Sequence, residues 1–581
     1  MTSDKIRIAL FPGATFSDLM EILQKHLHFL FLREVNIGPY LYYLLKINIA
    51  TRDLIYVYNQ WFDEDLVSLR QEPKVTAVEV EFEYLMDDNM YDSEVLQLWN
   101  LNGSITPSQN IPITWKRKSF TGKDKTIAFV ELEYMQTNHR DLVNQVVQDN
   151  TINWDYSNNS PYPTSPSPYE HGTHVAGVAI AQGGNDFCLV GVAPDATGIA
   201  TFIIPAISIG RKATDSDCAS AQTHQLGKVD IYNGSWGPKK FTAKFMHVPV
   251  CEFAMSEGGI KGRDGKGSIY VMSAGNDGPR FNTNTFSLRN SIYAIVVSAV
   301  NARNEPPSYA SVGSSIMVVA YAGDDNLKVN LLNPISECSK MDSGTSIAAP
   351  TVSGVIALVL EARPDLSWRD VQHLIVCTAN TNLKGTLVEW QRNGAGFLTH
   401  PRLGFGLIDA YTMVSLAEQW MLVPKLLSCS QSKRSEVTIT GRFRSDSIFI
   451  GCNSQPACQD CGCQIRYLEN IKVKVTLSWN GARWFNAAYR GQVELYLISP
   501  RGTKSYILTN RPADRLQPET FTWEFKSVQS WGENPCGTFL LSFGTRSNDV
   551  TVRLESWHLT LYGTMDPPPS LQACREAKQR F

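Results

Sequence analysis

This 581-residue chain lacks several features that would place it in a class at once. It has no run of 18 or more uncharged apolar residues, because Arg33, Glu34 and Lys46 interrupt its most apolar region, 26–50. We therefore expect no transmembrane helix. The first residues, MTSDK, lack the apolar stretch of a signal peptide. The net charge of −3 argues against a surface dedicated to nucleic acid, so no nucleic-acid partner is expected.

The composition that remains is that of a globular protein, with 43% hydrophobic and 19% charged residues. A chain of this length is expected to form two or three domains. It has 12 cysteines, and seven of them lie from Cys429 to Cys574. The spacing of Cys458 and Cys461 also suits zinc, but no second pair accompanies them, so disulfides are the favoured interpretation. Disulfides indicate the secretory pathway or secretion, and we interpret the missing signal peptide as a truncated gene model.

The pattern of apolar residues divides the chain into three folded parts and a tail. In the first part, 6–10 and 75–82 alternate like strands and 16–32 has helical periodicity, which predicts a small α/β unit. The second part alternates short apolar runs with helical patterns, so we predict a parallel sheet flanked by helices. The third part alternates with period two between turns, which is typical of a β-sandwich. The predicted boundaries are 1–86, 87–425, 426–566 and, for the tail, 567–581.

The stretch 342–361 (DSGTSIAAPTVSGVIALVLE) places Ser346 where small residues give way to an apolar run long enough for a buried helix. A serine on that tight turn has its hydroxyl beside a helix N-terminus. Backbone N–H groups and the positive end of the helix dipole then face whatever the hydroxyl attacks. The alternative is a turn that caps an ordinary core helix. This segment alone does not decide between the two.

Three further segments of the second part suit the same chemistry. His171 opens a helical stretch rich in alanine and glycine (EHGTHVAG, 170–177). Asn276 presents an amide side chain at a turn after a strand (SAGNDG, 273–278), and the strand end at 234–238 (GSWGP) could pair with an extended peptide. Each segment alone is weak evidence, since a lone histidine is usually structural. Together, and in this order, they indicate nucleophilic catalysis.

The order of these residues resembles that of the subtilisin-like serine protease superfamily. Further stretches resemble its kexin/furin branch, the proprotein convertases, including the P domain (homo B domain) of that branch. The resemblance covers nearly the whole chain and implies an α/β subtilisin fold, with an N-terminal prodomain-like unit and a C-terminal β-sandwich P domain. The stretches that carry the narrower resemblance are 69–75 (prodomain), 360–374 (peptidase domain), and 495–503 and 531–535 (P domain).

The resemblance implies a serine endopeptidase that hydrolyses peptide bonds of secretory-pathway proteins through an acyl-enzyme on Ser346. His171 would be the general base and acid, and Asn276 would donate to the tetrahedral oxyanion. An unrelated serine hydrolase is disfavoured because the chain has no Gly-x-Ser-x-Gly elbow. The residues implied to pair with the substrate backbone are Ser235, Trp236 and Gly237.

The triad aspartate of the family is missing from this chain. It should end the strand 126–130, but the chain continues VELEYM through 130–135. Counting from upstream puts the position at Glu131, and counting from downstream puts it at Leu132. Glu131 could orient His171, since glutamate serves in some other triads. The alternative is a surface turn in a decayed enzyme. The protein would then be a pseudoprotease that binds peptides or proteins without useful turnover.

The acidic residues with which convertases bind paired basic residues of their substrates are also largely missing. Lys239 and Lys240 follow the strand end at 234–238, and the loop 279–286 has no carboxylate. Asp215 and Asp217 remain as candidate substrate-binding acids. We therefore expect weaker selectivity for basic residues, or a different selectivity.

The junction after the first part lacks the polybasic run at which convertases cut themselves. Residues 79–86 read EVEFEYLM, which is acidic and apolar. We therefore expect the prodomain-like unit to stay attached and to act as a partner of the peptidase domain.

The resemblance also implies one structural calcium ion bound by Asp92, Asp141 and Asn185, whose hard oxygen ligands suit this cation. The family's second calcium site, near the specificity pocket, should be lost with its carboxylates. The resemblance implies two disulfides, Cys188–Cys338 and Cys429–Cys452.

Overall fold

The computed structural model divides the chain into two compact units, Met1–Asp88 and Asn89–Phe581. The residues that the structure describes are 5–10, 15–25, 29–37, 40–47, 75–81, 98–149, 151–156, 159–161, 170–202, 214–238, 245–333, 337–383, 389–452, 463–480, 489–516, 520–545, 551–568 and 574.

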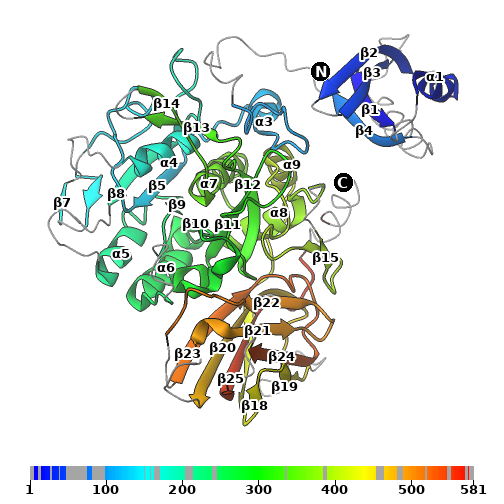
Figure 1. Ribbon diagram of the computed structural model, residues 1–581. Coiled ribbons are helices and arrows are strands. Elements are labelled where there is room, and N and C mark those ends of the chain that lie inside the picture. Colours follow the sequence, from blue (N-terminus) through cyan, green and yellow to red (C-terminus); the bar gives the residue numbers. More distant parts are fainter. Residues whose placement is uncertain are drawn as a thin grey trace. The chain divides into compact units, whose positions relative to one another are not determined.

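The first unit is a four-stranded antiparallel sheet with one described helix (Figure 1). In the helix, Leu19, Ile22 and Leu23 form a buried apolar stripe. The predicted helix over 16–32 is too long, because it ends at Lys25 and a strand follows. The run FLFL at 29–32 fits a strand as well as a helix, and pairing with the next strand decides between them. In order across the sheet, the strands are β2 (Phe29–Ile37), β3 (Tyr40–Ile47), β1 (Lys5–Leu10) and β4 (Val75–Glu81), and the helix is α1 (Phe16–Lys25).

The core of the second unit is an eight-stranded sheet whose strands are parallel except for the last pair. This confirms the predicted parallel α/β sheet. Both faces of its central strands are buried, which explains the continuous apolar runs. In order across the sheet, the strands are β12 (Ile316–Tyr321), β11 (Ala294–Val300), β10 (Ile269–Ser273), β9 (Ile231–Gly234), β5 (Thr126–Glu131), β8 (Thr197–Phe202), β6 (Trp154–Asp155) and β7 (Ser160–Pro161).

Helices cover both faces of this sheet (Figure 1). Ile127 and Phe129 of β5 pack in one core cluster, whereas Ala128 and Val130 pack in another on the opposite face. The first cluster includes residues of α3 (Ile111–Lys118), α4 (His171–Ile180), α7 (Thr345–Ala362), α8 (Trp368–Thr378) and α9 (Ala410–Ala417). The second includes residues of α5 (Asp215–Gln222) and α6 (Pro249–Lys261). Two short hairpins complete this part: β13 (Val329–Asn333) with β14 (Glu337–Asp342), and β15 (Gln391–Arg392) with β16 (Leu398–Thr399).

Within the described part of the chain, α7 is long and apolar enough to cross a membrane, but 83% of it is buried inside the protein. A core helix passes the same test of length and composition.

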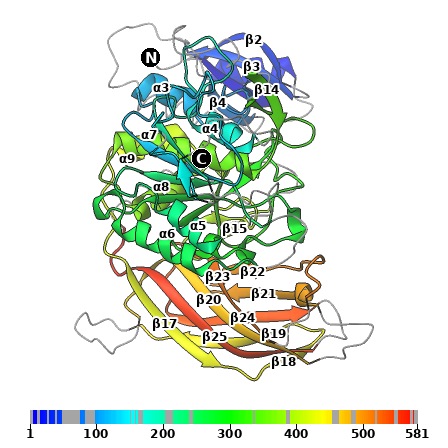
Figure 2. The same ribbon diagram turned by 90° about the vertical axis from the view of Figure 1, so that its left-hand side faces the viewer.

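The C-terminal part is a sandwich of two antiparallel sheets, as the period-two pattern predicts (Figure 2). Alternate residues of the strands, such as Val473, Val475 and Leu477, fill the core between the sheets. One sheet has the order β17 (Leu427–Arg434), β25 (Thr551–Thr564), β20 (Tyr467–Asn480), β23 (Thr520–Ser527), with β18 (Thr438–Thr440) also paired to β25. The other has the order β19 (Arg444–Ile450), β24 (Gly537–Thr545), β21 (Val493–Ile498), β22 (Lys504–Leu508).

The predicted disulfide Cys429–Cys452 is wrong. Cys429 bonds to Cys463, and Cys452 bonds to Cys536. Strand register explains this pairing, because Ile450 of β19 lies opposite Gly537 of β24 and so brings Cys452 beside Cys536. Two further bonds are Cys218–Cys251 and Cys377–Cys574. Cys188 is disulfide-bonded too, whereas Cys338, Cys458 and Cys461 lie outside the described side chains.

The sandwich holds one loop of the peptidase part through buried hydrogen bonds. The amide of Asn284 donates to the carbonyls of Ile507 and Lys526, both at 3.0 Å. The backbone carbonyl of Asn284 accepts from the indole N–H of Trp523 at 2.7 Å. The amide of Asn290 donates to the carbonyl of Glu524 at 2.8 Å. The segment 283–290, which contains the short helices η5 (Thr283–Thr285) and η6 (Ser287–Asn290), is therefore fixed by β22 and β23.

A buried ionic cluster also joins the two parts. Glu469 of β20 accepts hydrogen bonds from Arg369 Nε at 2.9 Å and from His373 Nε2 at 3.0 Å, both on α8. The three side chains are at most 8% exposed. Burial raises the pKa of Glu469, but His373 and Arg369 outweigh this effect and lower it to about 2. The carboxylate therefore contributes stability above its unfolded pKa, and this contribution is lost as the pH falls toward 2.

We expect Glu469→Gln to lower the free energy of unfolding by about 3–5 kcal/mol, because it leaves Arg369 buried without its counter-charge. Thermal or chemical denaturation near pH 7 measures this loss. The matched control is Glu436→Gln, whose carboxylate is 89% exposed and 3.9 Å from Arg553. That substitution should cost less than about 1 kcal/mol. Equal losses in the two variants would contradict the prediction.

Candidate active site

The predicted nucleophile lies where the long core helix begins. Ser346 is the second residue of α7, so its N–H lacks a partner within the helix. Gly344, just before the helix, has φ of 153°, and a Cβ there would lie 3.0 Å from the amide nitrogen of Asn276. Glycine therefore permits the close approach of these two segments. The Ser346 hydroxyl donates to the carbonyl of Ser235 at 3.0 Å, and the Ser235 hydroxyl donates to the carbonyl of Ser346 at 3.2 Å.

The predicted base, His171, contacts Glu131, which is one of the two positions where the sequence could place the acid of the triad. Glu131 ends β5 with a side chain 2% exposed, and its Oε2 lies 2.9 Å from Nδ1 of His171, the first residue of α4. The backbone N–H of His171 donates to Glu133 Oε2 at 3.3 Å. Residues 131–135 do not form an exposed turn, because Tyr134 and Met135 are buried as well. The structure therefore brings together the pair His171 and Glu131, whereas Leu132 is not a candidate acid.

The charges around His171 favour its protonated form. Burial lowers the pKa of His171, but the carboxylates of Glu131, Glu133 and Asp342 together raise it above the ordinary value. The hydrogen bond from Nδ1 to Glu131 acts in the same direction. With Nδ1 donating to Glu131, the other ring nitrogen, Nε2, is the atom left to accept a proton. The imidazole remains 30% exposed, so a substrate can reach it.

Asn276 is held in one orientation beside the nucleophile. Its Oδ1 accepts from the backbone N–H of Thr345 at 2.9 Å and from the Thr345 hydroxyl at 2.8 Å. The Thr345 hydroxyl also accepts from the N–H of Gly275 at 3.1 Å. The side-chain amide nitrogen of Asn276 is thus the end left to donate. Together with the N–H of Ser346, it provides two donors for an oxyanion.

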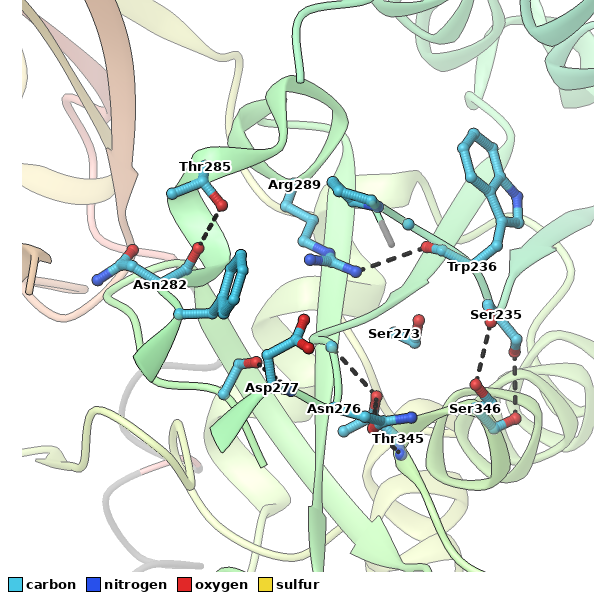
Figure 3. Close-up of a pocket in the computed structure, with 15 residues that line it drawn as sticks. Ser235, Trp236, Ser273, Asn276, Asp277, Asn282, Thr285, Arg289, Thr345 and Ser346 are labelled. Atoms are coloured by element: carbon cyan, nitrogen blue, oxygen red, sulfur yellow. Dashed lines mark hydrogen bonds between the residues drawn. The ribbon is translucent and has the colours of Figure 1, made fainter. Parts of the chain in front are cut away.

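A cavity of about 180 Å³ opens next to Ser346 and Asn276 (Figure 3). The predicted substrate-binding residues Ser235, Trp236 and Gly237 line one side of it, after the end of β9. The cavity also contains a residue that the sequence did not single out, Arg289 of η6. Its guanidinium is inside the protein, since Arg289 is only 5% exposed.

The structure does not bring Asp215 or Asp217 to this cavity. The carboxylate of Asp215 accepts from the backbone N–H groups of Val250 and Cys251, both at 2.9 Å, at the start of α6. Asp217 forms a capping box with Thr214 at the start of α5. Lys239 and Lys240 lie outside the described residues.

Two of the three predicted calcium ligands are neighbours. The side chain of Asp141 is fully buried. Its two carboxylate oxygens accept from the Asn185 amide at 2.9 Å and from the N–H of Leu189 at 3.1 Å. Asp92 lies outside the described residues, among which no group of three or more His, Cys, Asp or Glu side chains is arranged to hold a metal ion. Carboxylate and amide oxygens are ligands that a hard cation such as calcium takes. In this structure Asn185 turns its amide nitrogen to Asp141, and its Oδ1 accepts from the N–H of Phe187 at 3.0 Å.

Two known protein families match parts of this chain. The model of the Subtilase family matches residues 122–406, and that of the Proprotein convertase P-domain matches residues 472–561. The fold also resembles a solved Aeromonas sobria serine protease, crystallised in complex with the chaperone ORF2. The TM-score is 0.68 at 20% identity, covering 84% of this chain and 98% of that one. The class is therefore a subtilisin-like α/β fold with a C-terminal P domain.

Sequence relatives place the chain more narrowly. Neuroendocrine convertase 2 of Rattus norvegicus is 32% identical over 522 residues, covering 85% of this chain and 78% of that protein. Neuroendocrine convertase 2 of Drosophila melanogaster is 33% identical over 488 residues, covering 80% and 70%. Endoprotease bli-4 of Caenorhabditis elegans is 32% identical over 487 residues, but the match spans 49% of that longer protein. The chain belongs to the proprotein convertase family of subtilisin-like proteases.

Proposed function

We propose that this protein is a serine endopeptidase in which Glu131 takes the place of the triad aspartate. The observation that carries the proposal is the 2.9 Å contact between Glu131 Oε2 and His171 Nδ1. A carboxylate at this position fixes the imidazole tautomer and stabilises the imidazolium that forms during the reaction. The glutamate side chain is one methylene longer than that of aspartate and still reaches the ring from the last residue of β5.

The reaction proceeds by acyl transfer. The Ser346 hydroxyl leaves the carbonyl of Ser235 and attacks the scissile carbonyl carbon, while His171 Nε2 takes its proton. The amide of Asn276 and the N–H of Ser346 bind the resulting oxyanion. The intermediate collapses to an acyl-enzyme when the amine leaves with the proton from His171. Water, deprotonated by His171, then releases the acid and restores the serine.

The substrates are proteins or peptides of the secretory pathway that bind in extended form along Ser235, Trp236 and Gly237. This substrate class rests on the family and on the four disulfides among the described residues. The unit Met1–Asp88 is proposed as an intramolecular partner of the peptidase domain, since the junction that follows it lacks a polybasic cleavage sequence.

A serine-reactive fluorophosphonate tests the proposal on the full chain. We expect it to label Ser346, as located by peptide mapping, and the same preparation to cleave members of a fluorogenic peptide library. The alternative is a peptide-binding pseudoprotease, favoured by the hydrogen bond of the Ser346 hydroxyl to Ser235 in place of His171. A folded protein whose Ser346 stays unlabelled would favour this alternative over the enzyme.

We further propose that Asp141 and Asn185 hold a structural calcium ion, which would link the segment around Asp141 to the loop that follows α4. Chelation with EDTA is expected to lower the Tm by roughly 5–10 °C, and added calcium should restore it. Asp141→Asn should abolish the response to calcium, whereas the exposed Asp325→Asn should leave it intact. An unchanged Tm of the natural protein in EDTA would contradict the calcium site.

A further inference from the structure

In the proposed reaction, the cavity beside Ser346 receives the side chain of the substrate residue whose carbonyl is attacked. Ser346 and Asn276 line the cavity and position that carbonyl, so the adjoining side chain must point into the same space. The cavity is large enough for one side chain. Whatever charge its walls carry therefore selects the residue after which the chain is cut.

A buried cation forms part of these walls. The guanidinium of Arg289 lies between two backbone segments: a Cβ on Gly237 would be 2.5 Å from its Nη2, and a Cβ on Gly275 would be 3.2 Å from its Nη1. Glycine at these two positions is what leaves room for the group. Figure 3 shows Nη2 directed toward the carbonyl of Trp236, to which it donates at 3.5 Å, the outer limit of a hydrogen bond. The guanidinium carbon lies over the ring of Phe286, 5.3 Å from its centroid.

This cation is poorly neutralised. Its Nε has no hydrogen-bond partner, and Arg289 makes no ion pair within 4 Å among the described residues. Burial lowers the pKa of Arg289 to about 10, although the nearby Asp277 carboxylate acts in the opposite direction. The guanidinium is thus still charged at neutral pH. An unsatisfied buried donor of this kind is costly unless a ligand completes its hydrogen bonds.

We propose that Arg289 is a specificity-determining residue that binds a substrate carboxylate, so that the protein selects glutamate or aspartate immediately before the scissile bond. A carboxylate can accept from the planar guanidinium in two parallel hydrogen bonds. A lysine or arginine side chain in the same cavity would be repelled by the buried charge. Asp277 also lines the cavity, but it is partly exposed, so water screens its charge more than that of Arg289. This selectivity is the reverse of the dibasic preference that the family resemblance implies.

The inference rests on the proposed function only in assuming that the substrate lies with its scissile carbonyl at Ser346. The role of Arg289 can therefore be tested by measuring peptide binding, without any cleavage. The full chain carrying Ser346→Ala is titrated with three extended peptides that differ in one residue, Glu, Gln or Arg, at the position before the scissile bond. Calorimetry or fluorescence anisotropy gives each Kd. We expect the Glu peptide to bind about 10- to 100-fold more tightly than the Gln peptide, and the Arg peptide to bind most weakly.

Variants at Arg289 separate recognition from a structural role. In Arg289→Gln the ratio between the Glu and Gln peptides should fall to near 1, whereas Arg289→Lys should retain part of it. This ratio is internal to each variant, so a partial loss of folded protein does not change it. The matched control is Arg280→Gln, an exposed arginine at the end of η4 (Gly278–Arg280) that lies outside the cavity lining. It should keep the full preference.

The outcomes are distinct. Equal binding of the three peptides, or a preference for Glu that survives in Arg289→Gln, would overturn the assignment of Arg289. Tightest binding of the Arg peptide would overturn it as well and would indicate that Asp277 sets the charge preference of the cavity. If the protein with Ser346 intact is labelled by a fluorophosphonate while any of these results is found, the proposed function stands and only the specificity fails. If Ser346 is not labelled but the preference for Glu is observed, the enzyme fails and the specificity stands.

Discussion

Replacing Ser346 by alanine is expected to lower kcat for peptide hydrolysis by roughly 10⁶-fold while the protein stays folded. The equivalent substitution in subtilisin costs roughly 2 × 10⁶, since no other group can form the acyl-enzyme. Among the described residues, the hydroxyl makes one hydrogen bond, to the carbonyl of Ser235. We therefore expect little change in Tm. The measurement is turnover of the best fluorogenic peptide, with labelling by fluorophosphonate as a second readout.

The matched control for this prediction is Ser343→Ala, three residues upstream. Ser343 uses its backbone N–H, and not its hydroxyl, to contact Asp342 at 2.8 Å, and it does not line the cavity. Its loss should leave kcat within a few-fold of the natural protein. Residual hydrolysis in Ser346→Ala at more than about one hundredth of the natural rate would refute the acyl-enzyme on Ser346.

Replacing Glu131 by glutamine is expected to lower kcat roughly 10⁴-fold. The amide keeps the length of the side chain but removes its charge, so it no longer stabilises the imidazolium or enforces the tautomer with Nδ1–H. The same change removes the main carboxylate that raises the pKa of His171. In the natural protein, activity should rise with pH through a pKa above the usual histidine value, because the base must be neutral. In Glu131→Gln this rise should move to lower pH.

The profile of kcat/KM against pH between 5 and 9 measures this shift. Glu133→Gln is the control: its carboxylate contacts the backbone N–H of His171 and not the ring, so the loss of rate should be below about tenfold. Glu131→Asp restores the residue of the family but shortens a side chain that now makes a 2.9 Å contact, so we expect it to be slower than the natural protein. Full activity in Glu131→Gln would show that the contact has no part in catalysis.

The sequence predicted the parts of this site that local patterns determine. Ser346 and His171 each lie at the start of a helix, and Asn276 follows a strand, as the sequence patterns around them indicated. The sequence left Glu131 and Leu132 open, because counting from the upstream strand and counting from the downstream residues give positions that differ by one. The burial of Glu131 and its contact with His171 resolve the choice between these two positions.

Other features were out of reach for physical reasons. Disulfide pairing in the P domain depends on the register of β19 and β24, which no local pattern contains. Nothing around Arg289 signals that its side chain is buried, since an arginine after a run of polar and apolar residues usually lies at the surface. The role of Asp217, in contrast, could have been predicted. Thr214 lies three residues before it, and this spacing is the pattern of a capping box, which favours a helix start over a substrate subsite.

The hydrogen bonds that join β22 and β23 to Asn284 and Asn290 have a consequence for the proposed specificity. Arg289 sits in the segment that these strands hold, so part of the wall of the substrate cavity is maintained by another domain. If Arg289 selects the substrate as proposed, substitutions in β22 or β23 should change the peptide preference of the cavity without any change in the peptidase sequence.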